Sequence, residues 1–403
     1  MSGLFRHRTF LERRELRPAY DVVIIGGGVN GLSLAHNLAS RHGIDNVAVL
    51  DAKYIGSGGS GRNTQVVRAN YNTPETVPLY KASLGIWRTL SQELDFNLLF
   101  STEGELDLCH TWDSLEVERD KSLLNRAYGV QTDIVTPDEI ARMNPLVDLT
   151  GGGEFPIVGA SFHPPGSIAR HDSVVWGYAA SATRRGVHVH EQTEVTGIDV
   201  VDGRAVGVRT TRGPIAAGRV AIVAAGHASV VAALAGVALP LQSHPLQALV
   251  TELLEPLHPT VVMSNAVHVY VSQAHKGELV MGAGIDSYNS YAQRGSFHVI
   301  EHQLAAALEL FPIFARAHVL RTWAGIVDVG PDASPIIGRT PVEDLFVNCG
   351  WGTGGFKATP ASGWVMAATL ATGEPHELAR PYALDRFTSG ALIDEHGAAA
   401  VAH

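Results

Sequence analysis

Cysteine is scarce in this chain: Cys109 and Cys349 are the only two among 403 residues. Two thiols are too few for a disulfide framework or a four-thiolate zinc site. We therefore expect both to be reduced, buried small side chains of a cytoplasmic protein, and the sequence predicts no metal site.

An excess of basic charge and a long apolar run are also missing. The chain has 30 Lys and Arg residues against 40 Asp and Glu residues, which gives a formal net charge of −10. This balance argues against a nucleic-acid partner. No stretch is long and apolar enough to span a membrane, and the arginine-containing N-terminus lacks the apolar run of a secretory signal. We expect residues 1–20 to form a polar arm that rests on a partner.

What the sequence does contain is a nucleotide-binding pattern near its start. Residues 21–25 are mostly β-branched, which predicts a strand buried on both faces. Gly26, Gly28 and Gly31 follow with G-x-G-x-x-G spacing. Glycines at these positions allow a tight strand-to-helix turn, close approach of a pyrophosphate and tight packing of the helix on the strand.

The next segment completes a βαβ unit. A helix is predicted from about Leu32 to the residues before Gly43, and residues 47–50 have the pattern of the second strand. Asp51 ends that strand about 20 residues after Gly31, where an acid bonds the ribose hydroxyls of an adenosine. The unit predicts a bound dinucleotide, and the rest of the chain has to decide between FAD and NAD.

Two further glycine-rich segments are expected near this nucleotide. Residues 56–63 form a small-residue loop that suits a close approach to a flat ring, with a flexible surface loop as the alternative. Residues 351–357 form a second strand-to-helix turn whose backbone amides face a ligand. Together with single positions elsewhere, they complete the predicted cofactor-binding set: Gly58, Gly59, Arg62, Asn63, Val195, Gly226, Gly352, Gly354, Gly355 and Lys357.

The overall pattern predicts an α/β (α+β) fold, in which a Rossmann-like nucleotide domain is interrupted by a mixed-sheet substrate domain. We assign residues 21–100, 160–235 and 320–385 to the first, residues 101–159 and 236–319 to the second, and residues 386–403 to a tail. Further expectations are strands at 64–68, 96–100, 104–108 and 219–226. Asp172 is expected to cap a helix that ends at Gly186.

Several of these segments together resemble the glycine, D-amino-acid and sarcosine oxidase family of FAD amine oxidases. The nucleotide motif, residues 61–63, the strand ending in Ala224-Ala225-Gly226 and residues 350–357 carry the resemblance. Within the family, the chain is similar to the β subunits of heterotetrameric sarcosine oxidases. That likeness lies in four stretches: residues 168–172, 242–249, 269–279 and 392–397.

The resemblance implies more than the residue spacing shows. It implies noncovalent FAD, and a covalent FMN attached through His171 at an interface with an α subunit. It also implies γ and δ subunits, folate and NAD on the α subunit, and zinc on the δ subunit. The implied activity is oxidative demethylation of sarcosine to glycine, formaldehyde or a folate adduct, and hydrogen peroxide, with electrons passing from FAD to FMN to oxygen.

Two cations are the predicted catalytic residues. Arg68 suits a bidentate pair with the sarcosine carboxylate, and Lys357 lies beside the flavin as a second carboxylate partner or as a charge that tunes the ring. The amine has to lose its proton, but desolvation beside cations favours the neutral form without a dedicated base. His244, His268 and Tyr270 are candidates for orienting the amine.

Three alternatives remain open at this point. One is a single-flavin FAD dehydrogenase or oxidase of another N-methyl or D-amino acid, with His171 unmodified. Another is a non-catalytic flavin-fold scaffold subunit. An NAD-dependent dehydrogenase is the third, and it is weakened by the absence of a second full fingerprint.

Overall fold

The nucleotide motif begins in a central strand of a mixed sheet, in which the strands next to it are parallel. The computed structural model describes residue 11 and residues 14–395, so most of the predicted N-terminal arm and residues 396–403 lie outside the described part. In this sheet β1 pairs in parallel with β2 and β12, and β12 pairs with β19. Its strands are β10 (Val195–Val201), β11 (Arg204–Thr210), β12 (Gly213–Ile222), β1 (Ala19–Ile25), β2 (Val47–Leu50), β9 (His188–His190), β18 (Ile336–Arg339) and β19 (Leu345–Cys349).

Both faces of β1 are buried, as the unbroken apolar run predicts. Val22 and Ile24 face one core cluster, and Val23 and Ile25 face another, because side chains alternate along a strand. The helices that contribute to the first cluster are α1 (Val29–His42), α2 (Thr76–Leu94), α5 (His171–Arg184) and α8 (Gly355–Thr372). The short helix α6 (Ala228–Ala233) contributes to the second.

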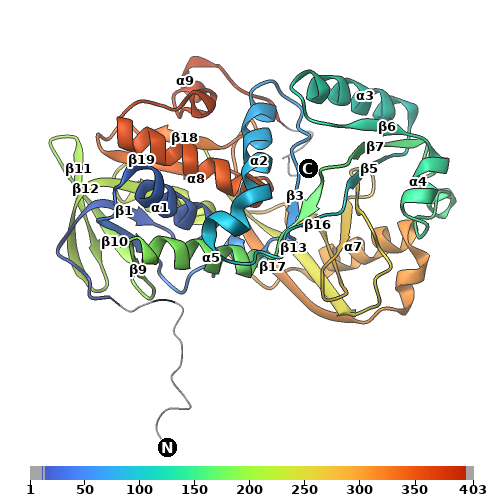
Figure 1. Cartoon of the computed structure of the whole chain (residues 1–403), viewed down its shortest axis with the longest axis horizontal. Coiled ribbons are helices and arrows are strands. Elements are labelled where there is room, and N and C mark those ends of the chain that lie inside the picture. Colours follow the sequence, from blue (N-terminus) through green and yellow to red (C-terminus); the bar gives the residue numbers. More distant parts are fainter. Residues whose placement is uncertain (1–10, 12–13, 396–403) are drawn as a thin grey trace, which may run out of the picture.

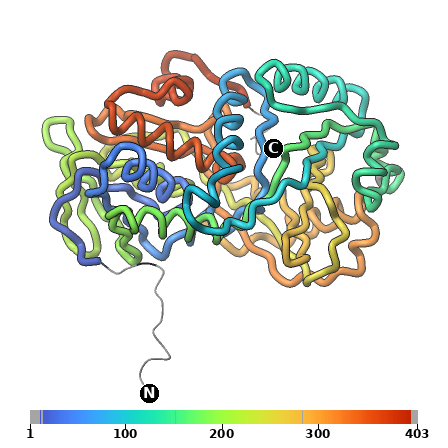
Figure 2. The backbone as a smooth tube through the Cα atoms, in the orientation of Figure 1, coloured from blue at the N-terminus to red at the C-terminus, as the bar shows by residue number. Residues whose placement is uncertain are grey.

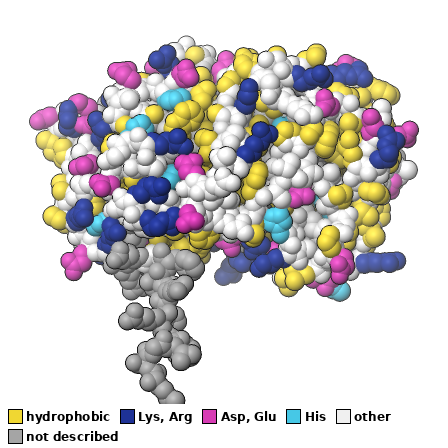
Figure 3. Space-filling view, viewed as in Figure 1, with side chains coloured by type: hydrophobic (Ala, Val, Ile, Leu, Met, Phe, Trp, Pro, Cys, Tyr) yellow, Lys and Arg dark blue, Asp and Glu magenta, His cyan; other side chains and the backbone are white. Residues whose placement is uncertain are grey.

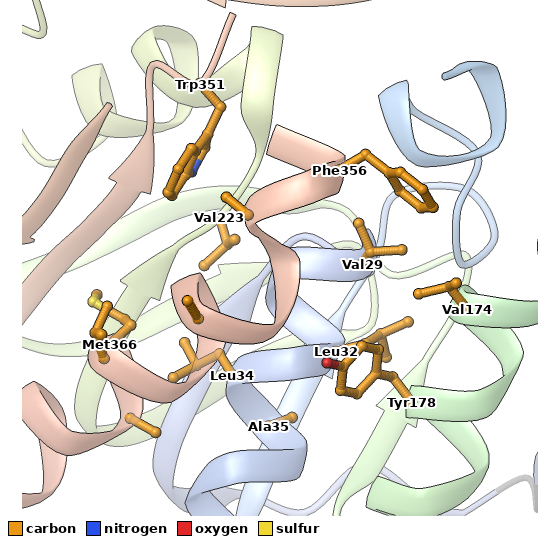
Figure 4. Packing of buried hydrophobic residues seen from close by; sticks show 14 of the residues in the cluster. Val29, Leu32, Leu34, Ala35, Val174, Tyr178, Val223, Trp351, Phe356 and Met366 are labelled. Carbon is orange, nitrogen blue, oxygen red and sulfur yellow. The ribbon is translucent and has the colours of Figure 1, made fainter. Parts of the chain in front are cut away.

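Helix α1 connects an early segment of the chain with a late one. It packs along α8, so the blue and red segments lie side by side in Figure 2. Figure 4 shows Leu32, Leu34 and Ala35 of α1 among side chains of α5 and α8. Each fully buried leucine of this kind stabilises the fold by about 1.5–3 kcal/mol. Helix α1 ends at Gly43, whose φ of 67° supplies the predicted left-handed cap.

A second large sheet forms the other half of the molecule, on the right in Figure 1. Its strands in spatial order are β17 (Val319–Val329), β13 (Gln242–Leu253), β16 (Glu278–Ile285), β15 (Val269–Gln273), β14 (Val261–Ser264), β5 (Glu105–Cys109), β7 (Gly159–His163) and β6 (Asp133–Val135). It is mixed, since β5 pairs in parallel with β14 and the other pairs are antiparallel. The helices on this half are α3 (Trp112–Ala127), α4 (Pro137–Met143) and α7 (Phe297–Leu310).

Smaller elements join the two halves. A three-stranded sheet contains β3 (Val66–Val67), β8 (Ser167–Ile168) and β4 (Ser101–Thr102). Helix α9 (Arg386–Ser389) follows α8 near the end of the described chain. No helix in the described residues combines the length and apolarity needed to cross a bilayer. On the face shown in Figure 3, basic and acidic side chains are interspersed.

The predicted α/β fold with a mixed second sheet is confirmed. The division of the chain into domains stays a prediction, and one boundary differs from the sheets. The sequence pattern assigns residues 320–329 to the nucleotide part, but β17 pairs with β13 along almost its whole length. This antiparallel ladder assigns the segment to the second sheet.

Three local predictions were wrong. Residues 96–100 form no strand, because Leu99 and the preceding Asp95 have φ of 50°. Asp172 is not the cap of α5: Arg170 occupies that position, and Asp172 lies in the first helical turn. The strand expected to reach Gly226 ends at Ile222, and Ala225 with φ of 45° begins a short 3₁₀ turn instead.

Candidate active site

A cavity of about 730 Å³ lies between the nucleotide motif and the second sheet. Its volume falls within the range of about 300–1,000 Å³ that is usual for small-molecule sites. The glycine turn after β1, the end of β2 and residues 57–64 form one side of its wall. Strands β13, β15 and β17, the turn before α8 and residues 193–196 and 223–227 contribute to the rest.

Most of the predicted site residues meet at this cavity, although they come from distant parts of the chain. The residues on its wall are Gly26, Gly28, Asp51, Gly58, Gly59, Arg62, Asn63, Arg68, Val195, Gly226, Gly352, Gly355 and Lys357. Gly31, Gly354 and His171 do not line it. The role of each residue stays a prediction. The fold brings these glycine-rich and charged segments together at one cavity, although they are far apart in the sequence.

The glycine turn has the form that a dinucleotide requires. Gly26 has φ of 121°, and a Cβ there would lie 2.2 Å from the carbonyl oxygen of Val223. A Cβ at Gly31 would lie 2.1 Å from the carbonyl oxygen of Gly26, so this glycine serves the packing of α1 on β1. Gly28 caps α1 at the cavity wall, where the positive end of the helix dipole favours a phosphate. The residues present therefore fit the pyrophosphate of a dinucleotide.

Asp51 stands at the end of β2 on the cavity wall, where the fingerprint predicts it. Its Oδ2 atom accepts a hydrogen bond from the Gly27 amide at 2.9 Å, and Oδ1 accepts one from the Lys53 amide at 2.8 Å. These bonds fix the carboxylate beside the glycine turn. A carboxylate has further lone pairs, so Asp51 can still accept from a ribose hydroxyl.

Arg68 lies on the cavity wall just after β3 and is only 4% exposed. Its Nη1 donates to the backbone oxygen of Asn70 at 2.6 Å, and its guanidinium carbon lies 4.6 Å from the ring centre of Tyr71. Its Nε lies 3.4 Å from Oε1 of Glu105. The guanidinium is thus held in one orientation by groups behind the cavity wall.

Lys357 lies on the same cavity wall, in the first turn of α8. Helix α2 holds this turn, since Ser83 Oγ and Trp87 Nε1 both donate to the Lys357 carbonyl oxygen, at 2.7 and 2.9 Å. Burial lowers the pKa of Lys357 to about 7, and the positive charge of Arg68 contributes to the same shift. The two predicted cations therefore belong to one electrostatic unit.

Two buried acids behind these cations were missed by the sequence analysis. Glu105 is 0% exposed and Asp107 is 7% exposed, and both project from β5 on the face opposite to Leu106 and Leu108. Asp107 accepts from Lys121 Nζ at 2.9 Å and from Asn70 Nδ2 at 3.3 Å. Acids at alternate positions of a strand were a detectable sign, because such a pattern places both carboxylates on one face.

The three candidates for orienting an amine differ in position. His268 and Tyr270 line the cavity, whereas His244 does not. Tyr270 accepts a hydrogen bond from Thr64 Oγ1 at 3.0 Å, and burial raises its pKa to about 12, so its hydroxyl keeps its proton. His244 Nδ1 lies 3.0 Å from the carbonyl oxygen of Asp286, a contact that orients it away from the cavity wall.

His171 is the first residue of α5 and lies outside the cavity. Its side chain is 17% exposed, and its Nδ1 accepts a hydrogen bond from the Asp172 amide at 2.6 Å. The preceding Arg170 pairs with Glu278 of β16 at 2.9 Å. His171 therefore stands where α5 meets the second sheet, at a partly open position.

The low pKa of Lys357 predicts a pH-dependent stability. In the unfolded chain the lysine binds its proton up to about pH 10.4, whereas in the folded protein it loses the proton above about pH 7. The unfolded state thus binds more protons between these values, and stability rises with pH in this window. We expect Lys357→Met to abolish this rise and to stabilise the fold at pH 7 by a few kcal/mol, roughly.

Thermal midpoints of the purified protein at about pH 7 and about pH 9 measure this effect. Lys53→Met is the matched control, because Lys53 is an exposed lysine at the rim of the same cavity. If Lys357→Met follows the pH dependence of the parent protein, the lysine is not desolvated.

Comparisons with known proteins identify the family of the chain. Residues 21–369 match the family model described as "FAD dependent oxidoreductase". The sarcosine oxidase β subunit of Arthrobacter sp. is 55% identical over 390 residues, which cover 96% of both chains. The corresponding subunit of Rhizobium meliloti is 46% identical over 94% of this chain and 91% of its own. Among solved structures, L-proline dehydrogenase from P. horikoshii matches with a TM-score of 0.88 and 27% identity, over 94% of this chain and 100% of its own. The chain therefore belongs to the FAD-dependent oxidoreductase family, in the branch of the sarcosine oxidase β subunits.

Proposed function

We propose that this chain is the catalytic flavoprotein subunit of a sarcosine oxidase, which converts sarcosine to glycine. The observation that carries this proposal is the pair Arg68 and Lys357 on the wall of a cavity that also contains a dinucleotide cradle. Sarcosine is a carboxylate with a secondary amine, so it needs a cation for one group and an oxidant for the other. The relatives named for this activity cover nearly the whole chain.

The chain's own residues prepare the substrate in this proposal. Arg68 binds the carboxylate, and its orientation is set in advance by Asn70, Tyr71 and Glu105. Where Lys357 is protonated, below about pH 7, it adds a second positive charge at the wall, which disfavours a protonated amine in the cavity. FAD held by the glycine turn and Asp51 supplies the hydride acceptor. Arg68 and Lys357 themselves and their fellow wall residue Phe356 are buried, which limits the access of water to this part of the cavity.

A second part of the proposal concerns FMN and the partner subunits. We place a covalent FMN on His171, because this imidazole stands outside the FAD cavity and is partly open. Oxygen would then be reduced away from the amine site and give hydrogen peroxide, while the imine gives formaldehyde or a folate adduct. Named relatives are β subunits, which supports an enzyme of several subunits. Our proposal extends this to a heterotetramer with α, γ and δ chains in the cytoplasm. Folate and NAD on the α subunit and zinc on the δ subunit complete this proposal.

The test of the activity is anaerobic reduction of bound flavin. We expect sarcosine to bleach the FAD absorbance of the purified complex, and glycine and D-alanine to bleach it much more slowly. Acid precipitation should release FAD into the supernatant and leave a second flavin on a peptide that contains His171. A protein that is not bleached by sarcosine despite full FAD occupancy would instead favour the scaffold alternative.

A single-flavin dehydrogenase of another secondary amine is the second candidate function. It is favoured by the similarity to L-proline dehydrogenase, since L-proline is also a carboxylate with a secondary amine. Faster bleaching by L-proline than by sarcosine, together with release of all flavin by acid, would support this candidate.

His171→Ala distinguishes the two flavin sites. We expect the variant to keep FAD and its reduction by sarcosine, because His171 lies outside the FAD cavity. Peroxide formation should fall by at least about tenfold, because the proposed route to oxygen is removed. Stopped-flow absorbance for the first step and a peroxide assay for the second measure this split. Normal oxygen turnover in a variant without covalent flavin would refute the two-flavin scheme. His188→Ala, a change to a histidine that does not line the cavity, is the control.

A further inference from the structure

The two cations of the cavity wall belong to a larger cluster of buried and nearly buried charges. It contains as many acidic as basic side chains: Glu105, Asp107, Glu118, Arg68, Lys121 and Lys357. These residues come from β5, α3, α8 and the segment after β3. If all are ionised, the cluster is electrically balanced. A substrate carboxylate that binds at Arg68 upsets this balance by adding one buried negative charge, which is costly at low dielectric.

The acids of the cluster differ in how well their charges are stabilised. Asp107 accepts hydrogen bonds from Lys121 and Asn70, at 2.9 and 3.3 Å. Glu118 accepts from Lys121 Nζ at 3.1 Å and from Ser161 Oγ at 2.5 Å. Glu105 is 0% exposed, and neither of its oxygens accepts a hydrogen bond from the described residues. Glu105 is therefore the least stabilised anion of the three.

The titratable groups around Glu105 come from several elements, while its β14 neighbour is the apolar Val261. Arg68 Nε lies 3.4 Å away, and Lys121 and Lys357 act at longer range. Asp107 on the same strand opposes its ionisation. His163, the partner of Glu105 on β7, is neutral, because burial lowers its pKa to about 4. Desolvation and the Asp107 charge raise the pKa of Glu105 to about 7.

We propose that the Glu105 carboxylate takes up a proton when a carboxylate ligand binds at Arg68. The bound anion competes for the guanidinium that is the nearest cation to Glu105, so protonation of Glu105 restores the charge balance. Glu105 thus acts as a positioning residue, which adjusts the charge around Arg68 without touching the ligand. This inference rests on the proposed carboxylate site.

The same uptake accounts for the proton of an amine substrate. Sarcosine enters as a zwitterion and reacts as the neutral amine, so one N–H bond of the substrate breaks. The amine proton leaves to water, one O–H bond forms on Glu105 with a proton taken from water, and no electrons are transferred. The cavity thereby gains a neutral amine without net release of a proton to water.

The test uses methoxyacetate, the analogue of sarcosine with an ether oxygen in place of the amine. This ligand carries the carboxylate but has no ammonium proton to release. Isothermal titration of the FAD-loaded complex at about pH 8, in buffers of different ionisation enthalpy, counts the protons exchanged. Above about pH 7 free Glu105 is mostly ionised, so we expect uptake of about one proton per site.

Infrared difference spectra identify the group that receives the proton. Binding of methoxyacetate should produce the C=O band of a protonated carboxyl group, which uptake by Lys357 does not produce. Both the band and the proton uptake should disappear in Glu105→Gln and persist in Glu118→Gln, the matched control from the same cluster. Glu105→Asp is the second variant, for use if Glu105→Gln does not fold. In this variant the C=O band of the protonated carboxyl group should shift in frequency.

The outcomes separate this inference from the proposed function. Uptake with a carboxyl band that depends on Glu105 supports it, even if sarcosine fails to bleach FAD and the proposed activity is therefore wrong. Absence of proton uptake, uptake without the band, or a band that persists in Glu105→Gln overturns it, even if sarcosine is oxidised. Methoxyacetamide, the uncharged analogue, should cause no uptake, and equal uptake with it would also overturn the inference.

Discussion

Replacing Arg68 with methionine should lower kcat/KM for sarcosine by about 30-fold to 4,000-fold. The change removes the cation for the substrate carboxylate, and losing one partner of a desolvated charge pair costs about 2–5 kcal/mol. FAD should remain bound, because the glycine turn and Asp51 are separate from Arg68 on the cavity wall. Steady-state kinetics and the flavin absorbance of the purified complex measure both effects.

Arg68→Met also affects the stability of the fold, so it has to be compared with a double variant. Arg68 is the nearest cation to the buried Glu105, so Arg68→Met drives Glu105 to its protonated form and leaves a buried carboxyl group without its partner, which destabilises the fold by about 1–3 kcal/mol. The double variant Arg68→Met/Glu105→Gln removes both charges and should regain most of this stability. It should still bind sarcosine as weakly as the single variant. Recovery of kcat/KM in the double variant would show that Arg68 acts on stability and not on the substrate.

Gly28→Val should weaken FAD binding by about 5-fold to 150-fold, the effect of about 1–3 kcal/mol of overpacking. Gly28 has φ of −78° and ψ of 176°, a conformation that valine adopts easily. A Cβ at this position meets only Ser60 Oγ, at 3.0 Å. The backbone can therefore fold normally, while the new side chain occupies the space where the pyrophosphate approaches the helix.

Reconstitution of the deflavinated complex with FAD, followed by flavin absorbance, gives the dissociation constant. Gly85→Val is the control, because Gly85 is an exposed position of α2 where an added Cβ would meet no atom within 4 Å. Full FAD occupancy in a folded Gly28→Val protein would contradict the assigned cradle. Gly26→Val is unsuitable for this test, since its φ of 121° and the clash with Val223 would disrupt the strand itself.

The nucleotide half of the site was predictable because its causes are local. The strand, the glycine turn, the helix with its Gly43 cap and Asp51 follow one another within a short stretch of sequence. Each depends on the conformational freedom of one residue or on a simple side-chain period. Local errors arose where this reasoning was too weak, as at residues 96–100. Leu99 in this segment has a left-handed backbone conformation, which the pattern of side chains does not predict.

The charged half of the site is a property of the tertiary structure. Arg68 and Glu105 are far apart in the sequence, and they meet because the segment after β3 lies against the first residue of β5. Lys357 joins them because α2 holds the first turn of α8 through Ser83 and Trp87. The sequence gives the type of each residue, but the pKa of its side chain depends on which charges the fold buries beside it. Local pattern therefore determined the cofactor cradle, and only long-range packing decided the charge balance that receives the substrate.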